Sequence, residues 1–291
     1  MNVVFATDRC FLQHLAVALV SLLANNSGMN IYIINNDIAA DDWRKLEKLF
    51  TGKDSKLINA KIDDRPIENL ITTCHFTKAN YYRLFIPEIV KEDRALYLDA
   101  DIVVNRKIDD LYNADISNTF LAAVDNMDIY NHHELEMESS AKYFNSGVML
   151  INLECWRANN VKEKVIEFIS RKPEVIRFVD QDGLNSVING NWLELHPKYN
   201  LHTRLLYIDY AADSPIKEAT INPSIIHYTG PSKPWHFRNI HPYKHLYWKH
   251  LRKTPYKYFI PDDLNIINII KWTVPLSVKQ YLKNIGNIKS K

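Results

Sequence analysis

Strand-like and helix-like segments alternate along roughly the first 230 residues, and this alternation most restricts the fold. Short apolar runs predict strands at 2–6, 30–35, 56–62, 94–99, 119–125 and 147–152. Apolar residues at helical spacing predict helices at 11–23, 41–50, 78–85 and 155–170. A chain of this kind is expected to form an α/β fold, with a mostly parallel sheet flanked by helices on both faces.

The composition favours one large core with a small appendage. Of the 291 residues, 46% are apolar and 24% are charged, which is typical of a globular protein. The pattern changes near residue 243, after which two short amphipathic helices are expected at 264–274 and 276–285, preceded by a helix at 243–253. We therefore predict one domain over residues 1–243 and a helical C-terminal segment over 244–291.

The C-terminal segment is basic and aromatic. It holds ten Lys or Arg and two Asp, a formal charge of +8, and because the whole chain carries +2, residues 1–243 carry −6. Tyr and Trp side chains are interleaved with these charges. Such a segment is typical of attachment to an anionic membrane surface, and a solvated end packed on the core is the alternative. We expect no nucleic-acid partner.

Cysteine use and the N-terminus both favour the cytoplasm. The three cysteines, Cys10, Cys74 and Cys155, are widely spaced and form no CxxC pair, so reduced thiols are expected. The N-terminus enters a strand at once, without the basic region and cleavage site of a signal peptide. No apolar run reaches the length of about 18 residues that a spanning helix needs.

Two carboxylates lie one residue apart inside an apolar run, residues 95–104. If Asp99 and Asp101 continue the strand, their side chains point the same way, because side chains repeat with period two. Buried carboxylates are costly unless they are paired or bound to metal. An isolated Asp-x-Asp is more often a solvated turn, but its position inside an apolar strand favours a cation site. Two oxygen ligands and one imidazole suit Mn²⁺.

His227 follows another apolar run and precedes a glycine turn that ends in Lys233. A histidine there is more often structural, but backbone N–H groups of the turn and a lysine ammonium suit a diphosphate. Asp180, Gln181 and Asp182 precede a helix that is predicted to start near Gly183, so at least one of the two carboxylates is expected to cap it. The alternative is that Asp180 or Gln181 lines a binding pocket. The chain lacks P-loop, dinucleotide-binding and nucleophile-elbow glycine motifs, which argues against those enzyme classes.

Taken in order, six segments resemble glycosyltransferase family 8, the retaining enzymes with a GT-A fold. They are Phe5-Ala6-Thr7-Asp8, Tyr81-Tyr82-Arg83-Leu84, Leu96-Tyr97-Leu98-Asp99-Ala100-Asp101, Tyr143-Phe144-Asn145-Ser146-Gly147-Val148, Asp180-Gln181-Asp182-Gly183-Leu184-Asn185, and His227-Tyr228-Thr229-Gly230 through Lys233-Pro234-Trp235. The resemblance covers roughly residues 1–240. It is closest to bacterial lipooligosaccharide and lipopolysaccharide galactosyl- and glucosyltransferases.

The resemblance implies roles for particular residues. Mn²⁺, with Mg²⁺ as an alternative, would be bound by Asp99, Asp101 and His227. The diphosphate and nucleotide of a UDP-sugar would be held by Ala6, Asp8, Ala100, Gly230 and Lys233. The donor sugar would be lined by Arg83, Asn145, Asp180 and Gln181, with Asp125 facing the donor sugar or the acceptor. Cys10 departs from the family pattern, because similar enzymes often carry a polar residue there.

By the same resemblance, the protein would transfer galactose or glucose from a UDP-sugar to a saccharide acceptor of a bacterial surface glycan. The catalytic residues would be Asp180, Gln181 and Asp125. An amide is a weak nucleophile, so front-face return is favoured over a covalent adduct on Asp180, which stays open. Two alternatives remain: a glycogenin-type enzyme that glycosylates protein or itself, and a UDP-sugar-binding protein without turnover.

Overall fold

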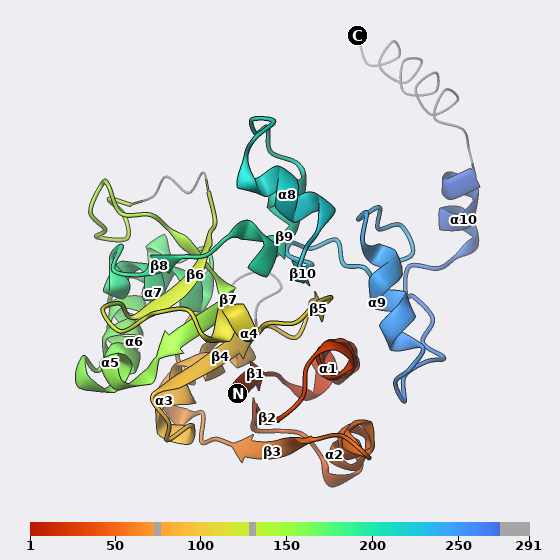
Figure 1. Ribbon diagram of the computed structural model, residues 1–291, viewed down its shortest axis with the longest axis horizontal. Coiled ribbons are helices and arrows are strands. Elements are labelled where there is room, and N and C mark those ends of the chain that lie inside the picture. Colours follow the sequence, from red (N-terminus) through yellow and green to blue (C-terminus); the bar gives the residue numbers. More distant parts are fainter. Residues whose placement is uncertain (73–76, 128–131, 274–291) are drawn as a thin grey trace.

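A computed structural model describes residues 1–72, 77–127 and 132–273 of the chain. Its centre is a seven-stranded sheet with the order β3-β2-β1-β4-β7-β6-β8 (Figure 1). These strands are β1 (Asn2–Ala6), β2 (Met29–Asn35), β3 (Ser55–Lys61), β4 (Arg94–Leu98), β6 (Leu121–Asp125), β7 (Phe144–Asn152) and β8 (Leu193–Glu194). Helices flank the sheet, so the predicted α/β architecture is confirmed.

Strand directions decide which residues meet at one edge of the sheet. β1 is parallel to β2 and β4, β2 is parallel to β3, and β6 is parallel to β8. Within the described ranges β7 alone runs against its neighbours β4 and β6. The start of β7 therefore lies beside the ends of β4 and β6. Ligands of open α/β sheets bind at this edge, where parallel strands end.

Two apolar clusters lie on opposite faces of the sheet, because alternate residues of each buried strand point to opposite faces. One cluster joins Val3 and Phe5 to Leu15 and Leu19 of the helix after β1. The other joins Val4 to apolar side chains of the segments after β7. The helices are α1 (Leu12–Asn25), α2 (Ala40–Glu47), α3 (Ile86–Ile89), α4 (Asp109–Tyr112), α5 (Leu153–Ala158), α6 (Val161–Arg171), α7 (Val179–Ile188), α8 (Pro215–Ile221), α9 (Lys244–Leu251) and α10 (Ile266–Thr273).

Short 3₁₀ helices connect several of these elements, and a smaller sheet adjoins the main one. The 3₁₀ helices are η1 (Arg9–Phe11), η2 (Lys48–Phe50), η3 (Arg65–Ile67), η4 (Lys78–Phe85), η5 (Pro173–Val175), η6 (Pro197–Tyr199) and η7 (Thr203–Leu206). The smaller sheet has the order β5-β10-β9, from β5 (Ile102–Val104), β10 (Ile225–His227) and β9 (Leu201–His202). β10 is antiparallel to β5 and parallel to β9.

Two local predictions were wrong. The strand predicted to carry Asp99 ends at Leu98, and the chain bends before it resumes as β5, so both carboxylates lie on a bend between strands. The single helix predicted over 155–170 is two helices, α5 and α6, because Asn160 adopts a left-handed conformation with φ 50°. Asparagine tolerates this conformation better than most residues, so it can end one helix and begin another.

The C-terminal segment begins in the core. In α9, Tyr247 and Leu251 are buried with Val17 of α1 and Tyr228. α10 lies at the periphery (Figure 1), and the helix predicted at 276–285 lies outside the described residues, as does Cys74. The division at residue 243 stays a prediction. Among the residues described, no helix combines the length and hydrophobicity that crossing a bilayer requires.

Candidate active site

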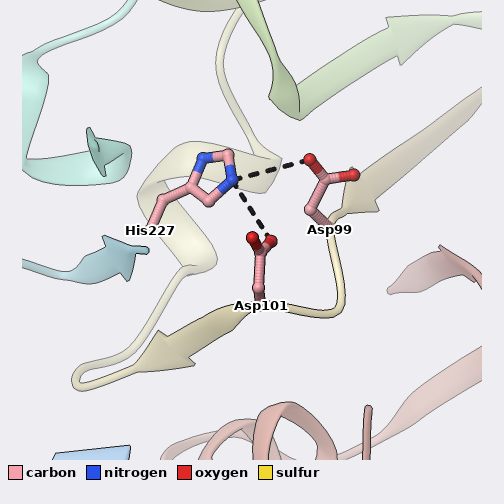
Figure 2. Close-up of side chains that lie close together, drawn as sticks. All are labelled: Asp99, Asp101 and His227. Carbon is pink, nitrogen blue, oxygen red and sulfur yellow. Dashed lines mark ion pairs between the residues drawn. The ribbon is translucent and has the colours of Figure 1, made fainter. Parts of the chain in front are cut away.

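Asp99, Asp101 and His227 come together at the carboxyl edge of the sheet, as Figure 2 shows. His227 Nε2 lies 3.5 Å from Asp99 Oδ2 and 3.3 Å from Asp101 Oδ1. One candidate ligand atom from each of the three residues lies within 4.8 Å of the others. The predicted cluster is therefore present, although the strand geometry invoked for the two carboxylates is not.

Strand pairing brings the histidine to the carboxylates. β10 pairs antiparallel with β5 so that His227 is opposite Ile102, the residue after Asp101. The next residue, Tyr228, donates its backbone N–H to the carbonyl of Asp101 at 3.0 Å. Residues distant in sequence are thus fixed side by side by backbone hydrogen bonds, and His227 itself is buried.

Gly147 on β7 makes room for this cluster. A Cβ atom at this position would lie 2.1 Å from His227 Cε1 and 2.7 Å from Asp99 Oδ2, which no side chain allows. The same glycine accepts a hydrogen bond at 2.8 Å from the backbone N–H of Asp99. The sequence places Gly147 at the start of a predicted strand and assigns it no function. A glycine inside an apolar strand often marks such a close approach.

Each carboxylate has one oxygen held by the protein and the other turned toward His227. Asp99 Oδ1 accepts hydrogen bonds from Arg83 Nη2 at 2.9 Å and from the Tyr97 hydroxyl at 2.7 Å. Asp101 Oδ2 accepts from Lys233 Nζ at 2.6 Å. The remaining oxygens and the imidazole nitrogen form a hard-to-borderline donor set, which fits a divalent cation such as Mn²⁺.

The ionisation of Asp101 follows from the same contacts. Burial by itself would raise the pKa of this carboxyl group. The ammonium of Lys233 and the imidazole of His227 outweigh burial and hold the pKa of Asp101 well below its usual range. Asp101 is therefore a carboxylate near neutral pH, the form that a cation ligand requires.

Arg83 on η4 joins the carboxylate cluster to a third acidic residue, Asp180. Its guanidinium contacts Asp180 Oδ2 through Nε at 3.1 Å and Asp99 through Nη2, and it lies over the ring of Tyr97 at 4.4 Å. The Ser146 hydroxyl also donates to Asp180 Oδ2, at 3.1 Å. Burial raises the pKa of Asp180 to about 7 against the opposing charge of the Arg83 guanidinium, and the negative charge of Asp99 adds to the rise.

Gln181 and Asp182 follow Asp180 on α7 and have different surroundings. Gln181 Oε1 accepts from the backbone N–H of Ser146 at 3.0 Å, and its Nε2 donates to the Tyr143 hydroxyl at 3.1 Å. Asp182 accepts from that same hydroxyl and from two backbone N–H groups just before α7. The helix expected to start near Gly183 starts at Val179, with Phe178 as its N-cap residue and no side-chain cap hydrogen bond. Asp182 therefore lies inside the helix and ties down the segment before it, and the capping function expected for at least one of these carboxylates is not found.

The residues predicted to hold the nucleotide lie around β1 and the turn after β10. Ala6 ends β1, and the Asp8 carboxylate accepts from the backbone N–H of Phe11 at 3.2 Å and from the Thr77 hydroxyl at 2.9 Å. Gly230 has φ +84°, a conformation that other residues rarely adopt. The turn then places the Lys233 ammonium on Asp101 and on the carbonyl of Tyr228, at 2.8 Å. Ala100 is buried between the two aspartates.

Asn145 and Asp125 lie at neighbouring strand ends. β6 pairs with β7 so that Asp125 is opposite Phe144, and Asp125 Oδ1 accepts from the backbone N–H of Met127 at 2.8 Å. Asn145 Oδ1 accepts from Asn200 at 2.8 Å. Their predicted contacts with the donor sugar or acceptor stay predictions. The sequence analysis assigns no role to several residues that surround the cluster: Tyr97, Ser146, Gly147 and Asn200. The first three lie in segments that resemble the family, whereas Asn200 lies in none of them.

The fold is shared with solved glycosyltransferases. The crystal structure of the galactosyltransferase LgtC in complex with donor and acceptor sugar analogues matches with a TM-score of 0.77 at 22% identity. The match covers 90% of this chain and 98% of that one. The chain therefore has the GT-A fold of that structure.

A family model named Glycosyl transferase family 8 matches residues 2–239, and the chain belongs to this family. General stress protein A of Bacillus subtilis (strain 168) is 33% identical over 271 residues, covering 87% of this chain and 94% of that protein. Lipopolysaccharide 1,2-glucosyltransferase of Escherichia coli (strain K12) is 29% identical over 277 residues, with 92% and 82% covered. The chain spans only 60% of another relative, glycosyltransferase GlyF of Streptococcus pneumoniae serotype 4 (strain ATCC BAA-334 / TIGR4), which is 30% identical.

Proposed function

We propose that the protein is a retaining, Mn²⁺-dependent hexosyltransferase that moves galactose or glucose from a UDP-sugar to a saccharide acceptor. The observation that carries this proposal is the convergence of Asp99, Asp101 and His227 beside Lys233 in a family 8 chain. Such a site binds the diphosphate of the donor through positive charge. Negative charge develops on this diphosphate when the glycosidic bond breaks, and the positive charge stabilises it.

Asp99 Oδ2, Asp101 Oδ1 and His227 Nε2 are the atoms that would hold the cation. When bound, a divalent cation supplies positive charge that stabilises the departing diphosphate without a proton. Lys233 contributes a second positive charge at the same place, and the open turn at Gly230 offers backbone N–H groups to the phosphates. Ala6, Asp8 and Ala100 complete the proposed nucleotide site.

Arg83, Asn145, Asp180 and Gln181 form the proposed donor-sugar pocket, and Asp125 faces the donor sugar or the acceptor. Gln181 is anchored by Ser146 and Tyr143, and its amide is a weak nucleophile. We favour front-face return: the acceptor oxygen bonds to the anomeric carbon on the face that the leaving group vacates. The acceptor proton then passes to an oxygen of the departing phosphate, and the anomeric configuration is retained.

The proposed acceptor is a bacterial surface glycan, in the lipopolysaccharide or lipooligosaccharide core. Membership of family 8 and the similarity to the Escherichia coli lipopolysaccharide glucosyltransferase support it. Such acceptors are attached to lipid, so the enzyme would act at the inner face of the cytoplasmic membrane. In α10, four isoleucines are exposed by 43% or more: Ile266, Ile267, Ile269 and Ile270. With the basic residues of 244–291, they suit an anionic membrane surface.

A panel of UDP-sugars tests the function. UDP release and transfer to truncated core oligosaccharides are measured with EDTA and with added Mn²⁺ or Mg²⁺, and the product anomer is assigned by NMR. We expect transfer from UDP-galactose or UDP-glucose that EDTA abolishes and Mn²⁺ restores, with an α-linked product from the α-linked donor. Tight UDP binding without any turnover would contradict the proposal, as would transfer that is unaffected by EDTA.

A further inference from the structure

Asn200 is fully buried between the candidate metal ligand His227 and Asn145. Its side-chain Oδ1 lies 3.0 Å from His227 Nδ1, and its Nδ2 donates to Asn145 Oδ1 at 2.8 Å. The backbone around it is fixed, because the Asn200 N–H donates to Pro197 and its carbonyl accepts from His202, both in hydrogen bonds near 3 Å. The amide is therefore held between two polar side chains by rigid backbone.

A backbone donor fixes the orientation of the two amides. The N–H of Gly147 lies 3.1 Å from Asn145 Oδ1, and a backbone N–H can only donate, so this atom of Asn145 must be the amide oxygen. The group of Asn200 that faces the same oxygen must then be its NH₂. The amide oxygen of Asn200 consequently faces His227 Nδ1, and an oxygen can only accept.

We propose that Asn200 is a positioning residue that accepts the Nδ1–H of His227 and so holds the imidazole ring with Nε2 toward Asp99 and Asp101. A cation can be bound only by the lone pair of Nε2, and an N–H on Nδ1 leaves Nε2 as the nitrogen that can supply it. The inference rests on the proposed metal site only for its consequence, because the Nδ1–H contact itself follows from the protein hydrogen bonds.

The proton on Nδ1 can be observed without metal, donor or turnover. Two-bond ¹H–¹⁵N correlation spectra of the wild-type protein in EDTA report whether Nδ1 and Nε2 of each histidine carry protons. The His227 signals are assigned by comparison with His227→Gln. We expect a proton on Nδ1, whether or not Nε2 also carries one toward the two aspartates, and a ring with its proton on Nε2 alone would overturn the proposal without any variant of Asn200.

Asn200→Ala tests the assignment of this role. We expect a ring with its proton on Nε2 alone to become populated, because the two aspartates then provide the remaining acceptors. We also expect a Mn²⁺ affinity reduced about 10- to 100-fold, measured by titration calorimetry in the absence of donor. In Asn145→Asp, a carboxylate oxygen still accepts from Gly147 and Asn200, so the proton on Nδ1 should be retained. If Asn200→Ala folds and leaves both the Nδ1 proton and the affinity unchanged, Asn200 does not position His227.

Asn152→Ala is the matched control for loss of a side-chain amide. Asn152 lies at the opposite end of β7 from Gly147, donates to the carbonyl of Ile116 and accepts from the N–H of Cys155, both at 3.0 Å. The variant should lose some stability and leave the His227 tautomer and Mn²⁺ affinity unchanged. Failure of the transfer assay would contradict the proposed function and leave the tautomer result intact, so the two failures are distinguishable.

Discussion

Arg83 and Asp180 form an ion pair at 3.1 Å in which each side chain is only 2% exposed. The same guanidinium binds Asp99, one of the three residues of the candidate metal site. The buried guanidinium of Arg83 is thus shared by two carboxylates, that of Asp99 at the candidate metal site and that of Asp180 in the proposed sugar pocket. The arrangement couples the two parts of the site, and it has consequences for stability and for pH dependence.

Replacing Arg83 should destabilise the protein strongly. Arg83→Met leaves Asp180 without its cation, and removal of one partner of a buried pair costs about 3–5 kcal/mol. Urea denaturation measures the change in the free energy of unfolding. Arg44→Met is the control, because the pair of Arg44 with Asp41 is exposed and worth at most about 1 kcal/mol. Equal effects of the two variants would contradict the importance of the buried pair.

Asp180 should make the protein less stable as the pH rises. Its pKa is raised to about 7 in the folded protein, so the folded state binds a proton more tightly than the unfolded state does. Its contribution to stability is therefore fully present below the unfolded pKa, near 4, and is lost as the pH rises through about 7. The stability of wild type relative to Asp180→Asn should fall between about pH 4 and about pH 8, by up to about 4 kcal/mol. Unfolding in EDTA across this range measures it, and a constant difference would refute the raised pKa.

Gly147→Ala should abolish cation binding. The added methyl group would overlap His227 and Asp99, so the two side chains cannot keep their positions. Titration calorimetry with Mn²⁺ measures the loss. Gly52→Ala is the control: Gly52 has positive φ, at +73°, but nothing lies within 4 Å of the place that an added methyl group would take, so stability alone should fall. Normal Mn²⁺ affinity in Gly147→Ala would mean that the three side chains do not bind a common cation.

Asp101→Ala should abolish Mn²⁺-dependent transfer. The substitution removes one candidate ligand and also the partner of Lys233, so both positive groups of the diphosphate site lose their anchor. UDP release is compared with that of Asp109→Ala, in which an exposed carboxylate on α4 is removed. Turnover like that of wild type in Asp101→Ala would refute the assignment of the metal site.

The exposed face of α10 should support membrane binding. Replacing Ile266, Ile267, Ile269 and Ile270 by Ser should abolish flotation with vesicles that contain phosphatidylglycerol, with no change in the free energy of unfolding. Vesicles of phosphatidylcholine alone should bind wild type weakly. Deletion of 244–291 is a poorer test, because it also removes Tyr247 and Leu251 from the core. Undiminished flotation of the substituted protein would show that α10 is not the attachment.

Much of the fold could be predicted from periodicity. β1 was predicted at its observed bounds, and other strands within a few residues, because buried strands are apolar and short. The break at Asn160 and the bend at Asp99 were missed. Both depend on single residues whose backbone conformation is chosen by surrounding structure rather than by local pattern.

For the site, the kinds of chemical group could be predicted from the residues alone: carboxylates at a strand end, a histidine after a second apolar run, and a lysine beyond a glycine turn. That these groups lie around one point could be learned only from the folded chain, because the β5–β10 pairing joins distant residues. The folded chain alone showed Gly147 as the space for His227 and Asn200 as its partner. Such roles arise from close contact between elements, which leaves no periodic pattern along the chain.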